Sequence, residues 1–136
     1  MKNKELLGSD GTGGFHNHVG YKILENAAGQ WIVTLDVSEQ HLNQYGVAHG
    51  GVSLTLMDVA GGVALYAHGP LIKRMATISM SQNFVSSVPP GLVTAIGHVD
   101  RFGRAVGYCT MKLYRGDLGG DLLASAQGSY RLFLED

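Results

Sequence analysis

The stretch that decides the fold is His41-Leu42-Asn43-Gln44-Tyr45-Gly46-Val47-Ala48-His49-Gly50-Gly51, together with the apolar run that continues to Ala67. Between residues 50 and 67 the one acidic or basic side chain is Asp58. A run of about 18 to 20 apolar residues can span a bilayer. Glycines in the run, its central carboxylate and the lack of a flanking basic cluster argue against a membrane span. We therefore predict the buried helix of a soluble domain, whose burial also buries a carboxylate.

The predicted helix is apolar on nearly every side, so other structure must cover it on several sides. Gly61 and Gly62 would allow another backbone or a ligand to approach it closely. Its end is predicted at His68-Gly69-Pro70, because proline cannot continue a helix and glycine tolerates the cap conformation.

The composition of the 136 residues indicates one globular domain with 45% hydrophobic and 15% charged side chains. A formal net charge of -1 gives no electrostatic reason to expect nucleic acid or an anionic membrane as a partner. One cysteine, Cys109, excludes an internal disulfide, and no signal-peptide core follows the N-terminus. We expect a cytoplasmic protein.

Residues 1–14 are expected to form a flexible N-terminal segment, because four glycines fall within the seven residues 8–14. Their spacing matches neither a P-loop nor a dinucleotide fingerprint. His16 and His18 have the spacing of a metal pair on a strand, but no cysteine or carboxylate lies nearby, so we expect surface histidines and no metal. Residues 15–136 are expected to form the single domain.

The segments on both sides of the helix have the period-two alternation of β-strands. The predicted strands are residues 19–25, 30–37, 76–85, 92–100, 105–115 and 121–134. Short connections favour antiparallel neighbours, and one apolar helix needs a sheet to wrap it. The sequence thus predicts an α+β fold with a curved antiparallel sheet of about six strands around one long central helix. One helix cannot cover all of the apolar strand faces, so a partner subunit is also expected.

The pattern Asn43-x2-Gly46-x2-His49-Gly50-Gly51-x6-Asp58, set in this order of elements, resembles the hotdog-fold acyl-CoA thioesterases of the phenylacetic-acid-degradation (PaaI-type) group. The resemblance extends over residues 15–133. It implies a hydrolase of acyl-CoA thioesters that needs water but no cofactor, coenzyme A being part of the substrate.

The resemblance also implies roles for individual residues. Asp58 would be the general base that activates water, or the nucleophile. Gly50 would supply a backbone N–H to the thioester oxygen, and Asn43 and His49 would help to hold that end of the substrate. Thr77 matches the position at which relatives carry a Ser or Thr that positions the attacking water.

Physical chemistry supports the same assignment independently. Thioester hydrolysis develops negative charge on the carbonyl oxygen, and a helix N-terminus offers free N–H groups and a favourable dipole. Gly50 and Gly51 suit that place, because a side chain there would obstruct a substrate. A base is best provided by a carboxylate kept out of bulk water, and Asp58 is the one candidate in the helix.

Helix geometry then predicts a shared site. Asp58 is eight residues beyond Gly50, which is about 12 Å along the axis and roughly 80° around it. A base and an oxyanion donor so far apart cannot serve one carbonyl. We therefore predict a two-fold dimer with antiparallel central helices, in which Asp58 of one chain meets Gly50 and Asn43 of the other. Further association into a dimer of dimers is expected from apolar strand faces.

Ordinary structural roles remain open for several of these residues. His49 could cap the helix, Asn43 could form a turn, and Thr77 could simply be a good strand former. Gly51 and Tyr45 are predicted to contact the substrate. Arg101 and Arg104, like Lys112, could meet phosphates of coenzyme A, although scattered basic residues more often form a solvated face.

Three functions are compared for this fold: hydrolysis of an aryl- or medium-chain acyl-CoA, a non-catalytic acyl-CoA-binding or sensing module, and a hydratase or dehydratase of acyl thioesters. A pure binding module gains nothing from burying an acid, and the spacing matches the hydrolases better than the hydratases. The acyl pocket is expected around the second half of the helix, residues 66–70 and Tyr45 of the partner subunit.

Overall fold

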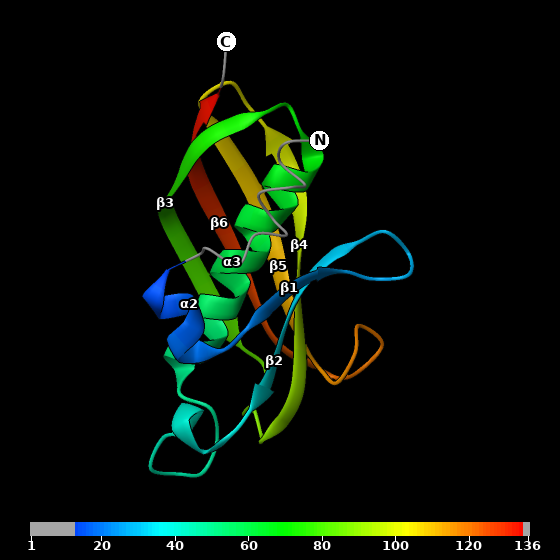
Figure 1. The fold of residues 1–136 in the computed structure, drawn as a ribbon. Helices are drawn as coiled ribbons and strands as arrows, with labels where there is room; N and C mark the ends of the chain where they lie inside the picture. The colour runs from blue at the N-terminus through cyan, green and yellow to red at the C-terminus, as the bar shows by residue number, and fades with distance from the viewer. Residues whose placement is uncertain (1–12, 135–136) are drawn as a thin grey trace.

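The fold was analysed in a computed structural model, which describes residues 13–134 (Figure 1). The elements, in chain order, are helix α2 (Gly14–Val19), strands β1 (Lys22–Glu25) and β2 (Trp31–Val37), the short 3-10 helix η1 (Glu39–His41), helix α3 (Gly50–His68), and strands β3 (Ile72–Phe84), β4 (Gly91–Phe102), β5 (Val106–Arg115) and β6 (Leu122–Leu134). The predicted α+β architecture is confirmed.

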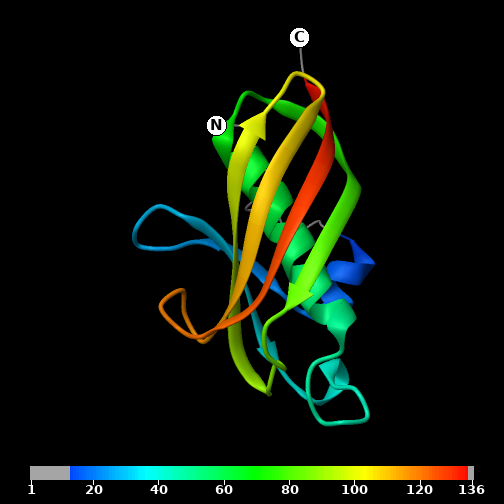
Figure 2. The ribbon, with the colours of Figure 1, turned by 180° about the vertical axis from the view of Figure 1, so that it is seen from behind.

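All six strands form one antiparallel sheet in the order β1-β2-β4-β5-β6-β3. The sheet curves around α3, which lies along one face, and no helix of the described residues 13–134 lies on the opposite face, called here the helix-free face (Figures 1 and 2). The period-two pattern of β5 explains this layering. Cys109, Met111 and Leu113 point to α3 and are buried, whereas Tyr108 and Lys112 on the other face are exposed.

Helix α3 ends where the sequence predicts, with Gly69 at φ 65° before Pro70. Its core face is in close contact with the sheet. A Cβ added to Gly61 would collide with the hydroxyl of Tyr130 on β6. The close neighbour that Gly61 allows is therefore a side chain of the same sheet.

Among residues 13–134, no strand of the sheet covers the opposite face of α3, so the sheet supplies only part of the cover that the sequence predicts. We call this face the uncovered stripe; it consists of Gly51, Leu54, Thr55 and Asp58, and Leu54 is 40% exposed. One sheet can cover only one side of a helix. Within a single chain Asp58 is therefore half-buried, and the predicted burial of its carboxylate is not achieved by its own sheet.

The N-terminal part of the domain also differs from the prediction. Residues 14–19 form helix α2, so the first strand begins at Lys22 and not at Val19. Gly20 ends this helix at φ 89° with its N–H donating to His16 O. His16 and His18 consequently point about 200° apart around a helix. Most of the predicted flexible segment, residues 1–12, lies outside the described residues.

Strand β3 is an edge strand, bonded to β6 on one side only. At and just beyond this edge Ile78, Phe84 and Val85 are each more than half exposed. An exposed edge with apolar side chains is a template for pairing with another strand. By length and composition α3 could cross a membrane, but here it is the central helix packed on the sheet.

Candidate active site

Asp58 lies at the middle of α3, where β3 approaches the uncovered stripe. Thr77 on β3 donates a 2.7 Å hydrogen bond from Oγ1 to Asp58 Oδ1. The hydroxyl of Tyr130 donates to the backbone carbonyl of Asp58 at 2.9 Å. Burial raises the pKa of Tyr130, and the negative charge of Asp58 raises this pKa further. Tyr130 therefore stays a neutral hydrogen-bond donor. Thr77 fixes one oxygen of the Asp58 carboxylate, which solvent can reach.

The first turn of α3 presents one free donor. The N–H of Gly51 donates to His49 Nδ1 at 2.9 Å, and the N–H of Val52 donates to the His49 carbonyl. The N–H of Gly50 has no acceptor among residues 13–134. It points out of a helix N-terminus, where an anionic oxygen is stabilised. A Cβ on Gly50 would lie 2.9 Å from the Phe84 ring, so a side chain of the same protein already occupies the adjoining space.

His49 has the capping role that the sequence left open. Because its Nδ1 accepts a hydrogen bond, the neutral ring carries its proton on Nε2. The side chain is exposed, so this second nitrogen is left to donate to a ligand.

Asn43 forms the turn of the loop before α3. Its Oδ1 accepts from the N–H of Tyr45 at 2.9 Å, and its backbone N–H donates to Val47 O at 2.8 Å. The side-chain oxygen is therefore used inside the loop, and the amide nitrogen remains as a donor. Tyr45 stands at the tip of this loop and is 80% exposed.

The predicted catalytic residues thus form two separate groups. Thr77 and Asp58 meet at the middle of α3, and Gly50, His49 and Asn43 gather at its N-terminus. The two groups are about 12 Å apart along the helix axis, so a single chain does not bring them to one carbonyl.

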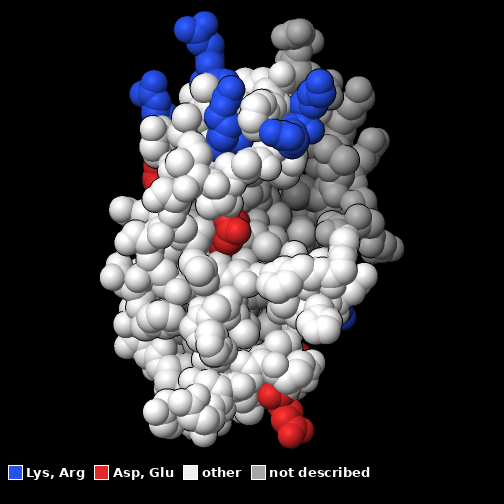
Figure 3. Space-filling view, turned by 90° about the vertical axis from the view of Figure 1, so that its left-hand side faces the viewer, with Lys and Arg blue, Asp and Glu red and all other residues white. Residues whose placement is uncertain are grey.

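Arg101 and Arg104 lie at the other end of the molecule, at the end of β4 and in the turn that follows it. They share that end with Lys73, Arg74 and Arg131, and Figure 3 shows how lysines and arginines gather there. We call these five residues the basic end; all are exposed. Within residues 13–134 no acidic side chain forms an ion pair with any of them.

Contacts between strands hold the basic end together. The guanidinium groups of Arg74 and Arg131 each lie 4.5 Å from the ring of Phe133, and Arg131 Nη1 donates to Ala105 O. The sequence did not reveal that Lys73, Arg74 and Arg131 join this group. Residues 73–74, 101–104 and 131 are far apart in the chain, and only the order of the strands in the sheet brings the ends of β3, β4 and β6 to the same end of the molecule. Lys112 is in the middle of β5 on the helix-free face, apart from the basic end.

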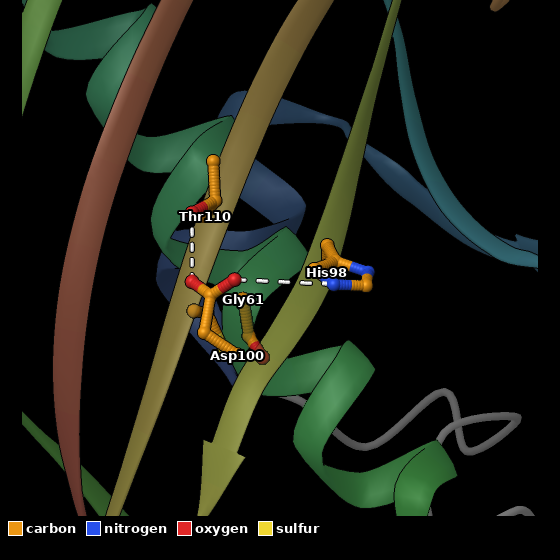
Figure 4. A network of polar contacts seen from close by, with 5 residues as sticks. Gly61, His98, Asp100 and Thr110 are labelled. Atoms are coloured by element: carbon orange, nitrogen blue, oxygen red, sulfur yellow. Dashed lines mark hydrogen bonds and ion pairs between the residues drawn. The ribbon is translucent and has the colours of Figure 1, made fainter.

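A second polar cluster lies on β4 and β5, also on the helix-free face (Figure 4). Thr110 Oγ1 donates to Asp100 Oδ2 at 2.7 Å, and His98 Nε2 is 3.9 Å from Asp100 Oδ1. This cluster is separated from Asp58 by the sheet. In the part of the chain that is described, no three His, Cys, Asp or Glu side chains are placed to hold a metal ion.

Comparison with known families identifies relatives of this chain. Residues 45–120 match the model of the thioesterase superfamily. Protein PA0474 of Pseudomonas aeruginosa, named as a candidate esterase, is 30% identical over 109 residues, which are 79% of either chain. The 1,4-dihydroxy-2-naphthoyl-CoA hydrolase of Listeria monocytogenes is 25% identical over 74% of this chain and 81% of its own.

Solved structures show the same fold. A point mutant of the phenylacetic acid degradation protein PaaI from Thermus thermophilus has a TM-score of 0.74 at 25% identity, over 88% of this chain and 98% of its own. The BH2602 protein from Bacillus halodurans, solved with CoA, has a TM-score of 0.85 at 18% identity, over 99% and 86% of the two chains. The second likeness concerns the fold alone.

Proposed function

Because the chain belongs to the thioesterase superfamily, and is thus a thioester hydrolase with a hotdog fold, we propose that it hydrolyses an aryl- or medium-chain acyl-CoA, with Asp58 as general base or nucleophile. The observation that carries the proposal is the pairing of Asp58 with Thr77 on the uncovered stripe of the helix whose N-terminus offers the free Gly50 N–H. The names of the PaaI and naphthoyl-CoA hydrolase relatives support assignment to the PaaI-type group.

The proposed site is shared by two subunits. In a two-fold dimer with antiparallel α3 helices, the N-terminus of one helix lies beside the middle of the other. Pairing of the two β3 edges would bring the uncovered stripes together and cover Leu54 and Ile78, which are exposed in the single chain. Each dimer then holds two equivalent sites, and further packing of dimers into a tetramer is part of the proposal.

The reaction follows from these positions. As general base, Asp58 accepts a proton from a water molecule held by Thr77, while the water oxygen bonds to the thioester carbon. The Gly50 N–H of the partner subunit, together with the His49 and Asn43 donors beside it, holds the oxygen that becomes negative. The carbon–sulfur bond then breaks, and the sulfur takes the proton, so that the products are a carboxylic acid and free coenzyme A.

A second route uses the same residues. As nucleophile, Asp58 would bond to the carbonyl carbon and release coenzyme A, and water would then hydrolyse the resulting anhydride. Either route consumes one water per thioester and calls for no metal or redox cofactor.

Coenzyme A is proposed to lie with its phosphates at the basic end, where Arg101 and Arg104 supply charge. From Asp58 to His68 the helix rises about 15 Å, a distance that the extended pantetheine arm of coenzyme A can span. Tyr45 of the partner subunit and the partner's Gly51 would line the path between. Hydrolysis of water-soluble CoA esters and a formal net charge of -1 fit the proposed cytoplasmic location.

Release of free thiol from acetyl-, hexanoyl-, lauroyl-, phenylacetyl- and hydroxybenzoyl-CoA tests the proposal. We expect turnover of at least one ester, which falls by a factor of about 100 or more in Asp58→Asn. Asp100→Asn is the matched control, because Asp100 also accepts a threonine hydrogen bond but lies on the helix-free face. Binding of the esters without thiol release would favour the sensing module instead.

A further inference from the structure

A cavity of about 650 Å³ lies between α2 and the first turns of α3. Its apolar lining comes from Phe15 and Val19 on α2, Leu42 in the loop and Val52 on α3. Its volume is in the range of pockets that enclose small-molecule ligands. His49 and Gly51 also line it, so the cavity opens beside the free N–H of Gly50.

A hydrogen bond at its C-terminal end ties helix α2 to the residues before α3. The carbonyl of Val19 accepts a 2.7 Å hydrogen bond from Nε2 of the buried His41, whose Nδ1 accepts from the N–H of Ser38 at 3.0 Å. These two bonds require the neutral ring with its proton on Nε2. The other end of α2 is exposed, and Phe15, 64% exposed, stands there at the edge of the cavity.

The position of the cavity relative to Gly50 suggests its occupant. A thioester carbon carries two groups besides its oxygen: the sulfur, which leads to coenzyme A, and the acyl group. With the oxygen on the Gly50 N–H and the sulfur directed along the dimer interface to the basic end, the acyl group is directed toward the nearest apolar space. That space is the cavity beneath α2, in the chain that supplies Gly50.

We propose that this cavity is the acyl-binding pocket, and that Phe15 and Val52 determine which acyl groups are accepted. The inference rests on the proposed function and replaces the expected pocket around the second half of α3 and residues 66–70. The carbon-rich lining favours an aromatic ring or an aliphatic chain of several carbons over an acetyl group, because only the larger groups bury apolar surface there.

Binding of non-hydrolysable alkyl-CoA thioethers tests the pocket without turnover. By titration calorimetry, Val52→Phe, which fills the cavity, should weaken hexyl-CoA and phenethyl-CoA by about tenfold or more and leave ethyl-CoA within about twofold. Phe15→Ala should weaken the two larger thioethers by about three- to tenfold. Tyr108→Ala is the matched control, since Tyr108 is an exposed aromatic residue on the helix-free face.

Equal effects of Val52→Phe on all three thioethers, or none, would overturn the inference. Should Val52→Phe fail to fold, Phe15→Ala decides on the same criterion, because Phe15 is exposed and its truncation leaves the core intact. Thiol release tests the proposed function separately. If binding depends on the length of the alkyl group but no thiol is released, hydrolysis is refuted and the pocket stands. If thiol is released but binding does not depend on that length, hydrolysis stands and the pocket is refuted.

Discussion

Thr77 on β3 and Asp58 on α3 are joined by a 2.7 Å hydrogen bond from the threonine hydroxyl to the carboxylate. The bond crosses from the edge strand of the sheet to the uncovered stripe of the helix, so it ties the proposed catalytic carboxylate to the strand at which a second subunit would pair. Orientation of Asp58 and assembly of the dimer are therefore expected to depend on the same strand.

The Thr77 hydroxyl is expected to contribute to the rate and little to substrate binding. Thr77→Val keeps the shape and removes the hydroxyl, and we expect kcat to fall by about tenfold or more with KM nearly unchanged, because the carboxylate and its water lose their orientation. Thr77→Ser restores the hydroxyl and should keep most of the rate. Equal kcat in Thr77→Val and the native protein, measured by thiol release, would remove Thr77 from the mechanism.

Sharing of the site between chains can be tested by mixing two inactive variants. Gly50→Pro removes the proposed N–H at the first helical position, where proline is well tolerated. His49 at φ -58°, ψ 141° already has the conformation that precedes proline. Alone, Gly50→Pro and Asp58→Asn should each lose about 100-fold or more in kcat.

After subunit exchange, a 1:1 mixture of these variants should recover about a quarter of native activity, because half of the dimers are mixed and each holds one intact site. Gly50→Ala is the control that keeps the N–H, although the Phe84 ring must move to admit its Cβ. A mixture that stays as inactive as its components would show that the site lies within one chain.

The basic end is expected to bind phosphate and nothing else of the substrate. Replacing Arg101 and Arg104 together by Gln should raise KM for an acyl-CoA by about tenfold, since each charge-assisted contact to phosphate contributes modestly. KM for the corresponding acyl-pantetheine, which lacks phosphate, should not change. Lys112→Gln is the control. A parallel rise of KM for both substrates would place these arginines elsewhere in the mechanism.

Cys109 should make stability depend on alkaline pH. Burial, followed by the negative charge of Asp100, raises the pKa of this thiol from 9.0 to about 12, and the side chain is 1% exposed. Between those values the unfolded chain loses the proton and the folded chain keeps it. The free energy of unfolding should therefore fall above pH 9 by about 1.4 kcal/mol per pH unit for this group.

Urea denaturation at pH 8, 9 and 10 measures this slope, and Cys109→Ala should reduce it by that amount while Tyr130 stays in both proteins. The same slope in the variant would show that Cys109 ionises equally in the folded and unfolded chains. Below pH 9 the two proteins should differ by a constant that reflects packing alone.

Much of the fold could be predicted because its signals are local. The apolar run from Gly50, its end at Gly69 and the alternation in β5 each follow from residues close together in the chain. The start of the domain was predicted less well. Without a long periodic pattern, residues 14–19 did not reveal α2, which depends on the left-handed Gly20 and on the hydrogen bond between His41 and Val19 O.

By itself, the sequence determined the central helix, the succession of two strands before it and four after it, the candidate residues Asp58 and Gly50, and the separation of these two residues along one helix. Helix geometry converts residue spacing directly into distance. Only the tertiary structure decided which side of α3 stays uncovered, that Thr77 meets Asp58, that five cations share one end, and where the cavity lies. The reason is that these relationships join side chains from strands, loops and helices far apart in the chain, and sheet pairing and packing alone bring them together.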